Sequence, residues 1–178
     1  MSDDSGDMEN RTSPLATAAP WLATVARLVL GGVFVVAGVL KLPDPAAAVR
    51  AVRAYRLLPE ALVSTVAFGM PVLEIAIGLA LVLGVFVRTA AIASAVLLTV
   101  YIAAIASAWA RGLQIDCGCF SKGGAVAAGQ TAYPAEIARD VGLLVVALAL
   151  ARWPRSRWAL GDLIAGPVAE EKEMSRAR

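Results

Sequence analysis

Two cysteines separated by one glycine are the residues of this sequence best suited to covalent chemistry. Cys117 and Cys119 are its only cysteines, and they stand in the segment DCGCFS at 116–121. A disulfide between them would close a very small ring, so its entropic contribution to stability is only about 1.5–2 kcal/mol, and strain would reduce this further although Gly118 permits the bend. A strained, exposed disulfide is easily reduced. We therefore predict a redox-active pair.

Three other interpretations of the pair remain open: a structural disulfide, a metal site, and two incidental loop residues. The sequence contains no histidine, so two thiolates alone cannot complete a tetrahedral zinc site. Two copies across a dimer could, and a linear copper(I) ion could also be held. We predict no metal and no evident cofactor, with a quinone as the open alternative.

Ionisable residues within apolar stretches form a second candidate group: Lys41, Glu74, Arg139 and Asp140. An ionisable group inside a membrane span is costly, which makes each a functional candidate. Antiparallel packing would bring all four to the membrane face that also carries the cysteines. We pair Glu74 with Lys41 or Arg139, and a cationic neighbour would lower a cysteine pKa. The alternative is that these charges only fix helix register through buried ion pairs.

One further charge, Arg27, lies inside the first apolar stretch and shares a stripe with Gly31, Phe34, Gly38 and Lys41. We count Arg27 among the supporting charges of the site. The two glycines are expected to let another helix approach closely, which is packing rather than chemistry.

The elements that must position these groups are apolar helices. Of the 178 residues 59% are hydrophobic and 17% charged, with a mean hydropathy of +0.72, whereas soluble domains are nearer half apolar and a quarter charged. A transmembrane helix needs about 20 mostly apolar residues, and four stretches fit: 21–40, 61–87, with a kink at Pro71, 89–109 and 137–151. We predict an all-α integral membrane four-helix bundle.

The membrane domain is expected to cover 21–152. Residues 1–20 are polar and acidic and are predicted to be a disordered tail rather than a signal peptide. Residues 153–178 are predicted to be a polar C-terminal tail. The net charge of +2 and the lack of a long basic run exclude nucleic acid as a partner.

A short amphipathic helix is predicted at 45–58, between the first two spans. Arg50, Arg53 and Arg56 recur every three residues and would share one side of it. Such a helix can lie on the membrane surface with its arginines against lipid phosphates. A solvated loop helix without a lipid role is the alternative.

An even number of spans places both termini on one side of the membrane. Basic residues do not decide which side, and counted literally they favour cytoplasmic loops. We nevertheless expect a multi-pass plasma-membrane protein with cytoplasmic termini. The reason is chemical, because disulfides form and persist in oxidising compartments. The cysteine loop is therefore expected on the extracytoplasmic side.

Four segments resemble, in their order, the MauE/DoxX family of redox-associated membrane proteins: RLVLGGVFVVAGVLKLPDP, MPVLEIAIGLALVLG, CGCF and ARDVGLL. The resemblance covers about 21–152. It implies a four-helix membrane protein with Cys117 and Cys119 at the family's thiol positions. It also implies that the family's recurring charges are matched by Arg27, Lys41, Glu74 and Arg139. One departure is Ser121, where the family usually has glycine.

The resemblance also implies a setting, since MauE is associated with maturation of the disulfide-rich small subunit of methylamine dehydrogenase alongside a thioredoxin-like partner. We predict a membrane thiol–disulfide protein that exchanges with a thioredoxin-like protein or a disulfide-containing client in extracytoplasmic protein maturation. One alternative is a non-enzymatic membrane anchor or assembly subunit of an electron-transfer complex. Another is a quinone or small-solute carrier centred on Glu74. Homo- and hetero-oligomers are both open.

Overall fold

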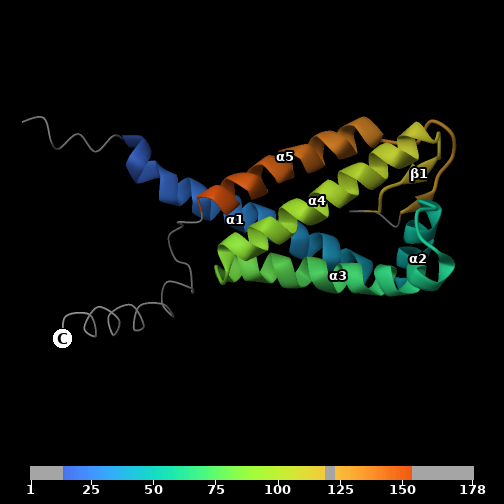
Figure 1. Cartoon of the computed structure of the whole chain (residues 1–178), viewed down its shortest axis with the longest axis horizontal. Helices are drawn as coiled ribbons and strands as arrows, with labels where there is room; N and C mark the ends of the chain where they lie inside the picture. The colour runs from blue at the N-terminus through green and yellow to red at the C-terminus, as the bar shows by residue number, and fades with distance from the viewer. Residues whose placement is uncertain (1–13, 119–122, 154–178) are drawn as a thin grey trace, which may run out of the picture.

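The computed structural model describes residues 14–118 and 123–153, which form four long helices, one short helix and a two-stranded sheet. Their bounds are α1 Pro14–Lys41, α2 Pro45–Ala54, α3 Glu60–Leu83, α4 Val87–Ala110, β1 Ile115–Asp116, β2 Gly124–Ala125 and α5 Tyr133–Arg152. Helix α1 packs on α3 and α5, and α4 packs on the same two helices, so the four long helices lie side by side (Figure 1).

Three of these helices are long and apolar enough to cross a membrane. They are Pro20–Lys41, Glu60–Leu83 and Val87–Ala110, with mean hydropathies of 2.1, 2.3 and 2.1. The predicted all-α membrane class is confirmed. Helix α5 has 20 residues but carries charges in both its first and its last turns, so the fourth span at 137–151 stays a prediction.

Several boundaries differ from the sequence expectation. Helix α1 begins at Pro14, within the predicted tail, because proline suits a first helical turn and the following 15–19 are rich in alanine. Helix α3 ends at Leu83 rather than at 87. Its C-cap Gly84 adopts a left-handed conformation, φ 72°, in which its amide bonds back to the last turn. The remainder of both predicted tails, 1–13 and 154–178, lies outside the described residues.

The predicted amphipathic helix at 45–58 is shorter in the structure. Helix α2 begins after Asp44, whose side chain accepts a hydrogen bond from the Ala47 amide at 2.8 Å. It ends at Ala54, and Arg56 follows it with a left-handed φ of 51°. The prediction that three arginines share one helix side is therefore wrong for Arg56. Helix α2 packs on α3 and β2, and its predicted contact with lipid stays a prediction.

Glycines set the spacing of α1 and α3, as the sequence predicted for Gly31 and Gly38. A Cβ at Gly31 would lie 2.8 Å from the Gly78 carbonyl oxygen, and one at Gly38 would lie 2.7 Å from the Pro71 carbonyl oxygen. Real Cβ atoms do not come this close to backbone, so larger residues would force the helices apart. The close approach at Gly38 is what brings the end of α1, at Lys41, against the middle of α3.

The β-ribbon, which the sequence did not predict, fixes the segment that carries the first cysteine. Its strands pair antiparallel, Ile115 with Ala125 and Asp116 with Gly124. Figure 1 shows α2 and β1 at one end of the long helices, opposite the α3–α4 turn. Lys41 and Cys117 thus both belong to this end, which we call the ribbon end.

Candidate functional site

Cys117 directly follows β1 and is held from two sides. The Tyr55 hydroxyl, beyond the end of α2, donates a hydrogen bond to the Cys117 carbonyl oxygen at 3.3 Å. The next amide, of Gly118, donates to the Asp116 carboxylate at 2.8 Å. Cys119, the second predicted thiol, lies outside the described residues.

The glycine between the two cysteines has a structural requirement of its own. Gly118 has a φ of 73°, a left-handed conformation that side chains disfavour. A Cβ on Gly118 would lie 3.2 Å from the Gly123 Cα, and a Cβ on Gly123 would lie 2.7 Å from the Ala51 Cβ of α2. Two glycines that flank 119–122 therefore touch each other and the short helix. The sequence indicated only that Gly118 permits a tight bend.

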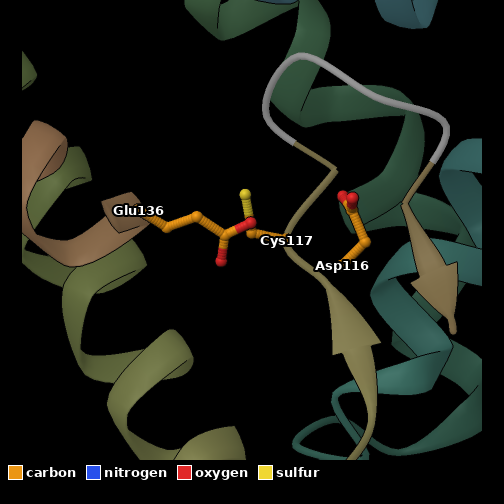
Figure 2. Close-up of side chains that lie close together, drawn as sticks. All are labelled: Asp116, Cys117 and Glu136. Carbon is orange, nitrogen blue, oxygen red and sulfur yellow. The ribbon is translucent and has the colours of Figure 1, made fainter. Parts of the chain in front are cut away.

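Two charged side chains from α5 approach the Cys117 sulfur. The Arg139 Nη2 lies 4.0 Å from Sγ, and a Glu136 carboxylate oxygen lies within 4.8 Å of it. Figure 2 shows the Glu136 side chain reaching from α5 towards Cys117. The guanidinium favours the thiolate form, while the carboxylate can accept the thiol proton. The Glu136 Oε2 atom is buried and has no hydrogen-bond partner in 14–118 or 123–153. Sequence reasoning missed Glu136 as a site residue.

The same three groups, Asp116, Cys117 and Glu136, also have the spacing of a metal-ligand set, since their ligand atoms all lie within 4.8 Å of one another. Their surroundings argue against a cation. Asp116 already accepts the Gly118 amide, and the Arg139 guanidinium brings a positive charge to the sulfur. The prediction of no metal stays a prediction.

A second cluster lies inside the bundle around Glu74, which is 1% exposed. The Lys41 Nζ donates to both carboxylate oxygens at 2.7 Å, and the Tyr101 hydroxyl donates to one of them at 2.5 Å. The same ammonium lies 5.9 Å from the centroid of the Tyr101 ring. The structure thus places Glu74 with Lys41, the first of its two predicted partners. Tyr101 was missed, because a tyrosine in an apolar helix carries no signal of its own.

The ion pair of Arg139 and Asp140 connects the group around Cys117 with the cluster around Glu74. Arg139 donates to Asp140 Oδ1 through Nε at 2.9 Å and through Nη2 at 2.8 Å. Asp140 is 2% exposed, and its Oδ2 has no partner within the described part of the chain. Glu74, Tyr101, Arg139 and Asp140 line a cavity of about 20 Å³, which is enough for one water molecule. Arg139 therefore stands between the buried carboxylates and the Cys117 sulfur.

Arg27 is the predicted site residue that the structure does not bring to this cluster. It is buried, at 2% exposed. At about 1.5 Å per residue it lies roughly 21 Å along α1 from Lys41. It lines neither the small cavity nor the larger one at the ribbon end.

The larger cavity, of about 560 Å³, lies between the end of α1, α2, α3 and α4. Its walls are mainly alanine, leucine, valine and proline side chains. Lys41, Tyr101 and Cys117 also line it, so the buried Glu74 cluster and the cysteine segment border one space. No pattern in the sequence predicted this cavity.

Comparison with known proteins places these residues within one family. Residues 19–153 match the family model described as Methylamine utilisation protein MauE. The methylamine utilization protein MauE of Paracoccus denitrificans is 39% identical over 105 residues, 58% of this chain and 56% of that protein. The chain thus spans little more than half the length of this curated relative. No solved structure matches the chain.

Proposed function

Because the chain belongs to the MauE family of membrane proteins related to methylamine utilisation, we propose that it is a membrane thiol–disulfide protein. Cys117 and Cys119 form the exchanging pair. The observation that carries the proposal is that the Cys117 sulfur lies near both the Arg139 guanidinium and the Glu136 carboxylate. One of these groups favours the thiolate and the other can take its proton.

Exchange proceeds by attack of a thiolate on a disulfide sulfur. When the pair is reduced, the Cys117 thiolate attacks the partner's disulfide and a mixed disulfide forms. Cys119 then attacks Cys117, which closes the pair and releases the partner with two thiols. The reverse reaction passes through the same mixed disulfide, and the Arg139 charge stabilises Cys117 as the leaving thiolate.

The partner is a thioredoxin-like protein or a disulfide-containing client in extracytoplasmic protein maturation. Such a partner needs the cysteine loop on the outer side of the plasma membrane. One observation weakens the argument for the opposite orientation. Lys41 and Arg139 form ion pairs with buried carboxylates of the bundle, so they do not act as loop charges. Without them the basic excess on the loop side, which argued for the opposite orientation, becomes smaller.

Thiol labelling tests the proposal directly, since the chain contains only two cysteines. Intact cells are treated with a membrane-impermeant maleimide, before and after mild reduction. We expect labelling to rise after reduction, with C117S/C119S as the unlabelled control. The variant Cys119→Ser should accumulate a mixed disulfide through Cys117, visible on non-reducing gels. Labelling that requires cell lysis would refute the extracytoplasmic loop.

A further inference from the structure

We infer that the cavity of about 560 Å³ binds a membrane quinone, and that this quinone accepts the two electrons of the Cys117/Cys119 dithiol. This inference rests on the proposed thiol–disulfide function and gives it a direction. Electrons then flow from a client dithiol to the cysteine pair and on to the quinone pool.

The cavity has the size and lining of a site for a small apolar ligand. Ligand sites are typically about 300–1,000 Å³, mainly apolar, with a few polar groups that orient the ligand. Here small side chains leave the space open, including Ala48 on α2, Ala67 on α3 and Ala104 on α4. A ring of six carbons with a short isoprenoid tail fits within this volume.

The cavity is accessible from the bilayer. Leu40 and Val100 line it and are also about half exposed on the outer surface, at 55% and 53%. Both belong to helices that are apolar and long enough to span a membrane. A ligand dissolved in the lipid phase can therefore reach the cavity without passing through water.

The polar groups of the cavity suit a quinone better than a lipid tail. Lys41 presents an ammonium with three N–H groups, two of which bond Glu74. The third can donate to a carbonyl oxygen, and the positive charge stabilises that oxygen as it becomes anionic during reduction. A hydrocarbon tail would form no specific interaction with this charge, and Cys117 is among the residues that line the same cavity.

The reaction balances without a further reagent. Two S–H bonds break and one S–S bond forms, so the dithiol loses two electrons and two protons. The quinone gains both pairs at its two carbonyl oxygens and leaves as a quinol. Glu136 takes the proton of Cys117, and the neighbouring Arg139 increases the fraction of electron-rich thiolate.

Photolabelling of the purified full-length protein with an azido derivative of a short-tailed benzoquinone tests binding. We expect label on peptides covering 40–58, 66–71 and 97–105. Ala104→Phe fills the cavity and should reduce labelling at least tenfold. Ala103→Phe, on the exposed side of the same helix, should label like the wild type. Ala48→Phe is a second filling variant on a different helix, with the exposed Ala46→Phe as its match.

A second measurement separates the inference from the proposed function. Anaerobic, reduced protein is mixed with decylubiquinone, and the expected product is one quinol per chain with loss of two thiols. Exchange with a dithiol peptide is measured in parallel and should persist in Ala104→Phe. If the peptide exchanges but quinone neither labels nor oxidises the pair, the inference is wrong and the proposed function stands. Cavity occupancy by phospholipid that quinone cannot displace would also overturn it. If the peptide fails to exchange with the wild type, the proposed function itself falls.

Discussion

The two ends of the bundle differ in the kinds of residue that they bury. Towards the α3–α4 turn, the helices bury Leu30, Leu81, Ala91 and Ala147 at 0% exposed, and this apolar packing holds the four helices together. At the ribbon end, the same helices bury Glu74 and Asp140 and surround two cavities. Charged groups and empty space both reduce stability. Apart from Arg27, the buried charged residues in the described part of the chain lie at the ribbon end, as do both of these cavities. This concentration indicates that the opposite end supplies stability and the ribbon end supplies chemistry.

The largest expected effect comes from removing the thiols. C117S/C119S should lose all disulfide exchange with a dithiol peptide, because no other cysteine exists. Unfolding in a detergent titration should shift by no more than about 0.5 kcal/mol, as for substitutions that leave core and buried charges intact. A variant that keeps full biological activity would instead support the anchor or assembly subunit.

Breaking the buried ion pair tests the cost of charge at the ribbon end. Glu74→Gln leaves Lys41 inside the bundle without its carboxylate, and we expect a loss of about 3–5 kcal/mol in unfolding free energy. The double variant E74Q/K41M should recover most of this loss, since no charge is then unpaired. If Glu74→Gln abolished function while the cysteine variants did not, the carrier centred on Glu74 would be the better description.

The close spacing of α1 and α3 is also needed for the Lys41–Glu74 ion pair. Gly38→Leu places a side chain against the Pro71 carbonyl and Ile75, and overpacking of this kind costs about 1–3 kcal/mol. It should also separate Lys41 from Glu74. Gly32→Leu is the matched control, because a Cβ at this position would meet no atom of another element within 4 Å. Equal unfolding curves for the two variants would contradict a packing role for Gly38.

Thiolate stabilisation is the subtler property of the ribbon end. Arg139→Gln removes the guanidinium beside Cys117, so a smaller fraction of Cys117 should be thiolate and its alkylation at neutral pH should be about tenfold slower. The rate should recover at higher pH, which loss of fold would not produce. Arg88→Gln, an exposed arginine at the opposite end, should leave the pH profile unchanged.

The smallest effect concerns the anchoring of α2 over the cavity. Asp44→Ala removes the N-cap of that helix and should cost about 0.5–2 kcal/mol, whereas Asp44→Ser, which retains a capping oxygen, should cost less. Hydrogen exchange of the α2 amides is the direct measurement. Unchanged protection in Asp44→Ala would show that packing on α3 and β2, not the cap, holds the helix.

Hydropathy and motif order alone were enough to predict an all-α membrane protein of the MauE family. Long apolar stretches must become helices in a bilayer because their backbone groups have no other hydrogen-bond partners. Buried charges likewise require partners, so the pairing of Lys41 with Glu74 was predictable from one antiparallel packing. Gly31 and Gly38 lie on the same side of the first span as Lys41, and this position predicted their close contacts with another helix.

Tertiary structure decided the features that depend on distant elements. Tyr101 joins Glu74 from another helix, and Glu136 reaches Cys117 from α5 across the β-ribbon. Arg27 shares a helix stripe with Lys41 but lies too far along the axis to take part. The large cavity forms where small side chains of four helices face one another. Because these side chains are far apart in the sequence, no local sequence pattern predicts the cavity. The sequence alone shows that a buried charged residue needs a partner, because an unpaired charge inside the bundle is costly. The packing of the helices determines which residue becomes that partner.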